Sequence, residues 1–383
     1  FKDLSFMGVG TNTLGYANPF IEKKVIETVK KGSMTTLNSI EEIKLAEKLV
    51  ELHPWSEMAR FTRSGGEANA VAIRIARAAS GKDNVAICGY HGWHDWYLSS
   101  NINDSNNLNE HLMNNVPVKG VPISLRNTVF PFQYNNFSQL KKIVENQKIG
   151  VIKMEVQRDF EPKNNFLEKV RKLANDKKIV LIFDECTSGF RKTLGGLHKH
   201  HKVNPDMAIF GKALGNGHAI NAIIGSKAVM ESSNSTFISS TFWTERIGPT
   251  AALATIEVME KNKSWEIISS MGKSIKKKWK IISKSNNLNL EIKGLDAIPN
   301  FTFKSKNHLA YKTYITQEML KKNFLASNAI FCSVSHNKNL LEKYFDILND
   351  LFSKISQFEK NNENINKILE TPICLGGMRE KKD

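Results

Sequence analysis

A lysine in an unusual setting is the first residue of this sequence that could carry chemistry. Lys212 stands in the stretch FGKALGNGH (210–218), among small residues and directly after the apolar run MAIF. A solvated lysine usually lies on a helix face with polar neighbours. Small neighbours instead let another molecule approach the backbone closely. The setting therefore predicts an amine that a ligand must reach.

A carboxylate also follows an apolar run. Asp184 comes directly after VLIF (180–183), a run too apolar to accommodate a charge that has no partner. The cationic nitrogen of a protonated heterocycle would be such a partner. The structural alternative is an aspartate that caps a helix.

Small residues follow the run MARFT (58–62). Ser64, Gly65 and Gly66 open a stretch typical of a helix. Their small side chains would let backbone N–H groups at the helix start approach an anion, and Ser64 would add a hydroxyl group. The structural alternative is an ordinary glycine turn in which Ser64 caps the helix.

An aromatic and imidazole cluster follows the run NVAICG (84–89). It begins with Tyr90 and His91 in the stretch YHGWHD. The cluster could stack on a flat heterocycle, or it could form a packed aromatic corner with hydrogen-bonded histidines.

The four features together match the needs of one cofactor, pyridoxal phosphate. Its aldehyde bonds to an amine, its pyridinium nitrogen needs a counter-charge, and its phosphate needs N–H donors. Each feature follows a strand-like run, and such a set rarely arises by coincidence. The sequence therefore predicts a pyridoxal-phosphate enzyme in which Lys212 forms a Schiff base with the cofactor.

The elements that must position these residues alternate along the chain. Strand-like runs are expected at 58–62, 84–89, 150–155, 180–185, 207–211 and 222–226. Helix-like stretches separate several of them, including 67–80 and 164–178. This alternation predicts an α/β fold with a mostly parallel sheet and helices on both faces. Ligands in such sheets bind at the carboxyl ends of the strands.

The pattern changes near residue 256 to lysine-rich helices and a few weak strands, expected at 300–304 and 328–334. Apolar residues recur at helical spacing through 261–284, which predicts an amphipathic helix. We therefore expect an N-terminal segment (1–44), a large cofactor-binding domain (45–255) and a small α+β C-terminal domain (256–383).

Composition limits the possible partners. The 383 residues carry a formal net charge of +16, but no basic motif is interleaved with aromatic residues, so we expect no nucleic-acid partner. No apolar run reaches the roughly 18 residues that a membrane helix needs, so we expect no membrane partner. The four cysteines form no CxxC pair, which favours reduced thiols, no metal site and a cytoplasmic location. The first residue is Phe, so we expect the true start to lie upstream.

In its motifs the chain resembles the fold-type I, class III pyridoxal-phosphate aminotransferases, and among them the glutamate-1-semialdehyde 2,1-aminomutase branch. The resemblance covers roughly two-thirds of the chain well, and the C-terminal third only loosely. It rests on LGYANP (14–19), RSGGEANAVAIRIARAASGKD (63–83), GYHGWHD (89–95), FDECTSGFR (183–191), FGKALGNG (210–217) and STFWTERIGPTAALATIEVMEK (240–261).

The resemblance implies a role for each of the residues singled out above. Lys212 would form the Schiff base and move a proton between the substrate carbon and the cofactor. Asp184 would pair with the pyridinium nitrogen. Ser64, Gly65 and Gly66 would hold the phosphate, although the aminomutases commonly have a threonine in place of Gly66, so one hydroxyl contact is lost.

The resemblance also implies contacts from more distant segments. Tyr90 would stack on the cofactor ring, and His91 would lie beside it. Glu155 would lie near the cofactor, although the proline that usually follows it is Val156 here. Thr241 would reach the phosphate of the neighbouring subunit's cofactor. A homodimer with shared active sites is therefore implied.

The departures from the family bear on the reaction. Aminomutases carry a mobile gate of small residues, whereas the matching stretch 240–245 reads STFWTE and is bulky and acidic. This favours a transaminase with a separate small-molecule amino donor and oxo acceptor. An aminomutase that makes 5-aminolevulinate is the alternative, and a non-catalytic binding protein is an alternative of another class. The family's preceding N-terminal strand, which we expect to be absent here, usually carries substrate contacts, so donor and acceptor stay open.

Overall fold

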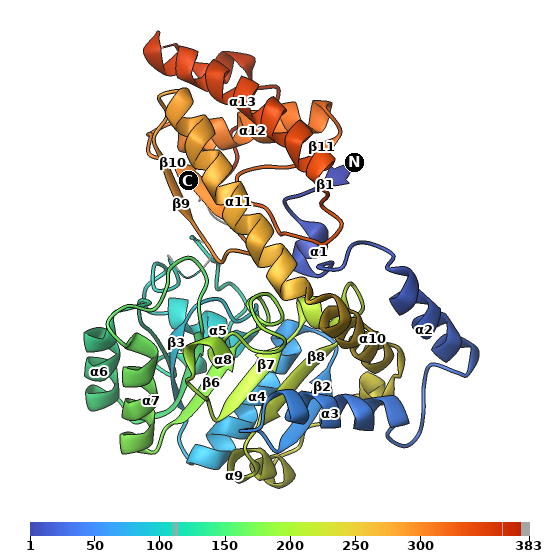
Figure 1. Ribbon diagram of the computed structural model, residues 1–383. Helices are drawn as coiled ribbons and strands as arrows, with labels where there is room; N and C mark the ends of the chain where they lie inside the picture. The colour runs from blue at the N-terminus through green and yellow to red at the C-terminus, as the bar shows by residue number, and fades with distance from the viewer. Residues whose placement is uncertain (110, 112–113, 362, 377–383) are drawn as a thin grey trace.

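The protein consists of a large body built around a sheet and a smaller body of long helices, which lies above it in Figure 1. The structure is a computed structural model that describes residues 1–109, 111, 114–361 and 363–376. Within these residues, no helix combines the length and the apolar character that a membrane crossing requires.

The seven-stranded sheet of the large body has the order β2-β8-β7-β6-β5-β3-β4. Its strands are β2 (Met58–Thr62), β3 (Asn84–Cys88), β4 (Val129–Pro131), β5 (Ile149–Glu155), β6 (Val180–Asp184), β7 (Met207–Phe210) and β8 (Asn221–Gly225). β4, β3, β5, β6 and β7 are parallel, and β8 is antiparallel to both β7 and β2. The predicted α/β fold with a mostly parallel sheet is confirmed.

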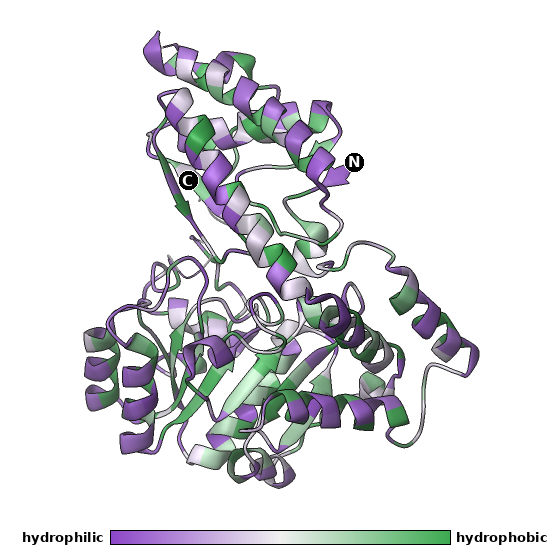
Figure 2. Ribbon diagram, in the orientation of Figure 1, coloured by the Kyte–Doolittle hydropathy of each residue, from purple (hydrophilic) through white to green (hydrophobic). Residues whose placement is uncertain are grey.

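Helices cover both faces of the sheet because its strands are apolar on both sides. Every residue of β5 and β6 is buried. Side chains alternate along β6, so Ile182 packs in the cluster beneath α4 (Gly65–Ser80), while Phe183 packs in the cluster with α7 (Phe166–Lys177) and α6 (Phe137–Asn146). Figure 2 shows the resulting pattern of apolar strands between helices with polar outer faces.

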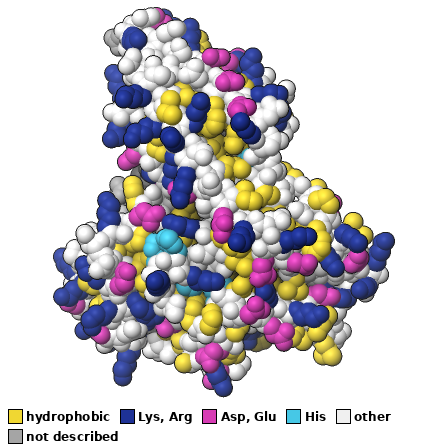
Figure 3. Space-filling view, viewed as in Figure 1, with side chains coloured by type: hydrophobic (Ala, Val, Ile, Leu, Met, Phe, Trp, Pro, Cys, Tyr) yellow, Lys and Arg dark blue, Asp and Glu magenta, His cyan; other side chains and the backbone are white. Residues whose placement is uncertain are grey.

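Further helices complete the large body. α10 (Ile247–Asn262) packs against α2 (Pro19–Lys30) and α3 (Ile40–Leu52), so part of the N-terminal segment lies on the large body. Lys and Arg side chains are spread over both bodies in the view of Figure 3 and form no single patch there. The net positive charge is therefore distributed across this face.

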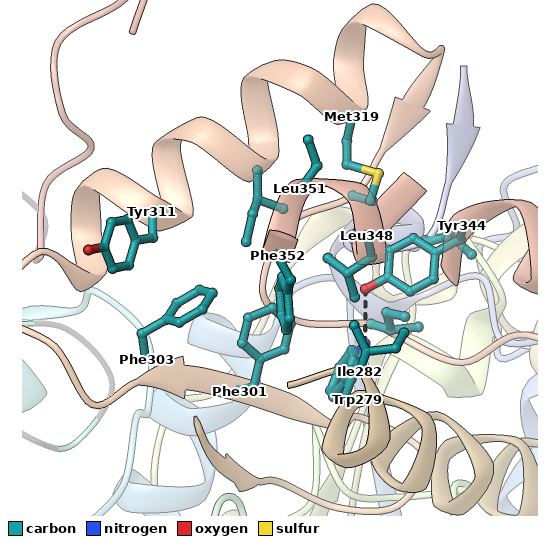
Figure 4. Close-up of a cluster of buried hydrophobic side chains, with 14 of the residues drawn as sticks. Trp279, Ile282, Phe301, Phe303, Tyr311, Met319, Tyr344, Leu348, Leu351 and Phe352 are labelled. Atoms are coloured by element: carbon teal, nitrogen blue, oxygen red, sulfur yellow. Dashed lines mark hydrogen bonds between the residues drawn. The ribbon is translucent and has the colours of Figure 1, made fainter. Parts of the chain in front are cut away.

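The small body has a core of aromatic side chains. It contains α11 (Ser264–Ser285), α12 (His308–Lys321), α13 (Lys338–Lys360) and the antiparallel pair β9 (Leu290–Lys293) and β10 (Asn300–Phe303). In its core, Trp279 Nε1 donates a hydrogen bond of 3.0 Å to the Tyr344 hydroxyl, and Phe301 packs edge-on against Trp279 (Figure 4). The amphipathic helix expected at 261–284 is confirmed as α11.

The first residues of the chain belong to the small body. β1 (Lys2–Asp3) pairs in parallel with β11 (Phe324–Leu325). The prediction of a strand at 328–334 is wrong. The backbone of this segment forms hydrogen bonds with several segments instead of with one neighbouring strand. Phe331 N donates to Leu4 O, and Cys332 N donates to Ala297 O.

Our division into three domains stays a prediction. The long helices after residue 264 form the small body, and residues 377–383 of the predicted C-terminal domain lie outside the described residues. The pairing of β1 with β11 joins part of the segment 1–44 to that body.

Candidate active site

Three neighbouring parallel strands bring charged side chains to one edge of the sheet. Glu155 ends β5 and is the register partner of Asp184, which ends β6. Asp184 in turn pairs with Ile209 of β7, and Lys212 follows two residues after the end of that strand. Because parallel strands end at the same edge, the glutamate, the aspartate and the lysine lie in adjacent positions along it.

Asp184 is a buried carboxylate with partners on several sides. Its side chain is 4% exposed, His91 Nδ1 lies 2.9 Å from Oδ2, and Cys186 N donates to Oδ1 at 3.1 Å. Lys153 Nζ lies 3.5 Å from Oδ2. Burial raises the pKa of Asp184, but the Lys153 ammonium and the His91 hydrogen bond outweigh it and hold the pKa well below its usual range. Asp184 is therefore ionised.

The Lys212 amine lies in a protected position. Its Nζ donates a hydrogen bond of 2.9 Å to Thr187 Oγ1. Burial, together with the positive charges of Arg158 and Arg191, lowers the pKa of Lys212. Its φ angle of +47° is a left-handed conformation, which costs a residue with a Cβ roughly 1 kcal/mol, so the surroundings impose it. The neutral, nucleophilic form of the amine is thus more accessible than in water.

Glu155 is held by a backbone amide and a guanidinium. Its carboxylate accepts from Tyr90 N at 3.2 Å and from Arg158 Nε at 3.1 Å. A Cβ added to Gly89 would lie 2.5 Å from Glu155 Oε2, so the close approach requires glycine there. Burial raises the pKa of Glu155, and the Arg158 guanidinium opposes that shift.

The start of α4 forms the small-residue turn. Ser64 is its N-cap and accepts from Glu67 N, while Gly65 and Gly66 are its first two residues. A Cβ added to Gly66 would lie 2.6 Å from His94 Cε1, so a threonine would collide with this histidine. The glycine at this position therefore matches its packing, and the α4 N-terminus has the geometry of an anion site.

Asn221 connects this turn to Glu155, Asp184 and Lys212, which we call the strand-end cluster. It opens β8, and its Nδ2 lies 3.5 Å from Cys186 Sγ. A Cβ added to Gly65 would lie 3.8 Å from Asn221 Nδ2, and one added to Gly211 would lie 2.0 Å from it. The helix start, the residues after Asp184 and the residue before Lys212 therefore meet around one side chain.

Tyr90 and His91 take different positions although they are adjacent in the chain. Tyr90 is half-buried, and its ring lies edge-on to Tyr97 at 6.0 Å. His91 is fully enclosed, stacks on Trp96 at 6.4 Å and contacts Asp184. Burial lowers the pKa of His91 to about 4, so the ring is neutral and orients Asp184 through Nδ1–H.

Thr241 lies apart from this cluster, on an exposed segment. It begins the short helix η5 (Thr241–Thr244), and its side chain is exposed. The same segment is anchored to the start of α4, because Trp243 Nε1 donates to Glu67 Oε1 at 2.9 Å and Arg63 Nη2 donates to Glu245 O at 2.8 Å. The bulky residues of this stretch therefore fix it against the turn at Ser64.

Four residues of the site were not singled out in the sequence. They are Lys153, Arg158, Thr187 and Asn221, which contact Asp184, Glu155, Lys212 and Cys186 respectively. A lysine inside the apolar run GVIKME was a signal for the first of them. The other three are polar residues in or beside loops, and only the fold places them at the site.

Comparison with known proteins identifies the family. The sequence model of the class-III aminotransferases matches residues 5–339. This chain belongs to the class-III aminotransferase family. It is 32% identical to the 3-aminobutyryl-CoA aminotransferase of Cloacimonas acidaminovorans over 94% of this chain and 84% of the relative.

Aminomutases are also among the relatives. The chain is 35% identical to the glutamate-1-semialdehyde 2,1-aminomutase of Sulfurisphaera tokodaii, over 70% of this chain and 65% of that protein. Among solved structures, an omega-transaminase from Sphaerobacter thermophilus superposes with a TM-score of 0.81 at 20% identity, covering 93% of this chain and 86% of the other. A transaminase with PLP bound gives a TM-score of 0.82 at 18% identity, over 94% and 87% of the two chains.

These findings establish a pyridoxal-phosphate-dependent enzyme of amino-group transfer, either an aminotransferase or a closely related aminomutase. An aminotransferase takes an amino donor and an oxo acceptor. The residues present fit the cofactor: an ionised, buried Asp184 suits a protonated ring nitrogen, the N-terminus of α4 suits a phosphate, and the Lys212 amine suits an aldehyde. When bound, pyridoxal phosphate supplies an aldehyde that bonds to amines and a ring that withdraws electrons from the substrate carbon.

Proposed function

We propose that the enzyme is a transaminase that moves an amino group between separate small molecules, with Lys212 as the residue that carries the cofactor covalently. The observation that supports this most strongly is the placement of Glu155, Asp184 and Lys212 at the ends of three adjacent parallel strands. Residues at such strand ends face the ligand crevice of an open α/β sheet.

Each side chain has a role in this proposal. Lys212 Nζ takes a proton from the substrate carbon and returns it, which its lowered pKa favours. Asp184 supplies the fixed negative charge that keeps a ring nitrogen protonated. The turn Ser64, Gly65 and Gly66 binds the phosphate through backbone N–H groups at the α4 N-terminus.

Tyr90 and Glu155 would line the ring site in this proposal. The half-buried Tyr90 ring offers an aromatic face, and its backbone N–H is fixed by the Glu155 carboxylate. His91 would act one step away from the cofactor, because it is enclosed and holds Asp184.

The segment 240–245 supports transfer between two molecules over transfer within one. An aminomutase must retain its intermediate behind a closing gate, whereas a transaminase must release a product and admit a second substrate. Here Trp243 is bonded to Glu67, and Arg63 holds the carbonyl of Glu245, so the stretch is tied to α4.

The aminomutase is the second candidate, because the Sulfurisphaera tokodaii relative carries that activity in its name and is 35% identical. The test supplies glutamate-1-semialdehyde alone and measures 5-aminolevulinate. No sustained conversion is expected. With amino acids and 3-aminobutyryl-CoA as donors and 2-oxo acids as acceptors, we expect ping-pong kinetics instead. Multiple turnovers on the semialdehyde alone would reverse the assignment.

The proposal includes a homodimer in which Thr241 serves the neighbouring site. Large aromatic side chains are exposed on this side of the molecule: Trp93 is 71% exposed, Phe237 84% and Phe242 60%. Exposed apolar surface of this kind is typical of protein interfaces. We also place the enzyme in the cytoplasm, in keeping with its four free thiols.

Mixed dimers test the shared site. A Lys212→Ala protomer is combined with a Thr241→Ala protomer, and cofactor affinity and activity are measured. If Thr241 serves the neighbouring site, the mixed dimer contains one site with intact Lys212 and intact Thr241. The cofactor affinity of that site should equal the affinity of the wild type. A mixed dimer in which that affinity equals the Thr241→Ala homodimer would contradict the assignment.

A further inference from the structure

A lysine is buried in the middle of the sheet next to the site. Lys153 lies on β5, and its side chain is 0% exposed. Its register partners are Ile87 on β3 and Ile182 on β6, both fully buried. Lysine is almost never fully buried without a specific partner, so its position needs an explanation.

The surroundings of Lys153 offer one close anion. Its Nζ lies 3.5 Å from Asp184 Oδ2, and within the described residues Nζ has no hydrogen-bond partner. The other titratable groups that act on it are Glu155 on its own strand, Cys186 in the loop after β6 and His91 in the loop after β3. The residues that α4 buries against the sheet are all uncharged.

Two cationic groups would therefore compete for the Asp184 carboxylate: the Lys153 ammonium and the protonated ring nitrogen of the cofactor. Before the cofactor binds, one carboxylate faces one lysine, and the pair is neutral. The proposed function brings a protonated ring nitrogen to the same carboxylate and adds a second positive charge to an enclosed, water-poor site. Arg158 is already paired with Glu155, so no other buried carboxylate in the described residues near Lys153 can offset the added charge.

We propose that Lys153 is a positioning residue that balances the charge of Asp184 while the ring site is empty and releases its proton to solvent when the cofactor's ring nitrogen takes over that carboxylate. The inference rests on the proposed function, because it assumes that the ring nitrogen faces Asp184. Lys153 is the group that yields the proton, because burial disfavours its charged form and Asp184, the close anion that opposes this effect, would then be paired with the ring nitrogen.

The proposal has a consequence for cofactor affinity. Binding that releases a proton becomes tighter as the pH rises, by up to about tenfold per pH unit for one proton. Replacing Lys153 by Met removes the proton that must leave but keeps an apolar side chain of similar length. His91 and the Cys186 amide still hold Asp184 ionised in this variant.

The experiment titrates cofactor-free protein with pyridoxamine phosphate, which does not bond to Lys212, by calorimetry in buffers of different ionisation enthalpy. We expect the wild type to release about one proton more than Lys153→Met. We also expect the affinity of the variant to exceed that of the wild type at low pH and to converge with it at high pH. Lys153→Gln serves as a second uncharged variant if the Met variant does not fold.

Lys172→Met is the matched control, because Lys172 forms an exposed ion pair of 2.8 Å with Asp176 and lies outside the site. It should release as many protons as the wild type. Equal proton release by the wild type and both Lys153 variants would overturn the inference.

Borohydride trapping of pyridoxal phosphate distinguishes failure of this inference from failure of the proposed function. A label on a lysine other than Lys212 would overturn the proposed function itself.

Discussion

The strand-end cluster and the segment 240–245 hold their polar residues in different ways. Asp184 is buried and has contacts from His91, Cys186 and Lys153. Thr241 is exposed, and the bonds of the segment around it include those from Trp243 to Glu67 and from Arg63 to the Glu245 carbonyl. The comparison indicates that Asp184 is held from several sides by residues of its own chain, whereas the side chain of Thr241 faces solvent.

Removing the lysine of the strand-end cluster should have the largest effect. Lys212→Ala deletes the proposed nucleophile and proton carrier, so we expect activity to fall by about 10³-fold or more. Borohydride treatment in the presence of pyridoxal phosphate should label Lys212 in the wild type and leave the variant unlabelled, as read by peptide mass spectrometry. Lys172→Met is the control and should be labelled normally. Comparable turnover by the Lys212 variant would contradict its role.

Asp184→Asn tests the charge at the same edge. The amide cannot hold a ring proton, so we expect a loss of about 10²-fold or more in rate. The substitution also leaves Lys153 without its anion, and we expect the free energy of unfolding to fall by about 3 kcal/mol. Adding Lys153→Met should recover most of the stability and none of the activity. Urea unfolding and kinetics of the single and double variants measure both effects.

Acid should weaken the strand-end region. Burial lowers the pKa of His53, His91 and His111 to about 4, so these rings are neutral in the folded protein and gain protons on unfolding below about pH 6.5. The free energy of unfolding should therefore fall as the pH drops from about 6.5 to about 4, by at most about 1.4 kcal/mol per pH unit for each histidine.

His53→Phe checks this pH dependence. His53 stacks on Phe210 at 5.0 Å, so an aromatic ring is compatible with the site. The variant should be less stable at neutral pH, because Gly196 N loses its acceptor, but its stability should vary less with pH. Urea unfolding between pH 4.5 and pH 7 measures this. Identical slopes in the two proteins would show that His53 does not contribute.

The smallest effect is expected in the exposed segment. Trp243→Phe keeps an aromatic ring and removes the hydrogen bond to Glu67, so the free energy of unfolding should fall by only about 1 kcal/mol. Cofactor affinity should change little, because Arg63 also holds the segment. A large loss of cofactor affinity, measured by fluorescence titration, would show that the exposed segment matters to the site as much as the strand-end cluster does.

Much of the strand-end cluster could be predicted from the sequence because its residues follow apolar runs. Parallel strands place such residues along one edge, which is why Asp184 and Lys212 were expected together. The contact of His91 with Asp184 was not indicated, because adjacency to Tyr90 does not give the direction of a side chain. Lys153 was missed because its partner is set by the pairing of β5 with β6, which the sequence does not reveal.

The fold was predicted where hydrophobic periodicity was strong and missed where it was weak. The runs that became β2, β5, β6 and β7 have clear apolar patterns, as does α11. β1 has only two residues, and its partner β11 lies more than 300 positions later, so no local pattern could indicate the pairing.

That pairing bears on the order in which the polypeptide acquires its structure during synthesis. Lys2 and Asp3 leave the ribosome more than 300 residues before their partners Phe324 and Leu325. Ser5 Oγ likewise cannot accept its hydrogen bond from Ser327 N until residue 327 has been made. The large body can fold while translation continues, since domains generally fold as units. The small body cannot close until residues 324 and 325 have been made, and Lys2 and Asp3 must stay free of other contacts until then.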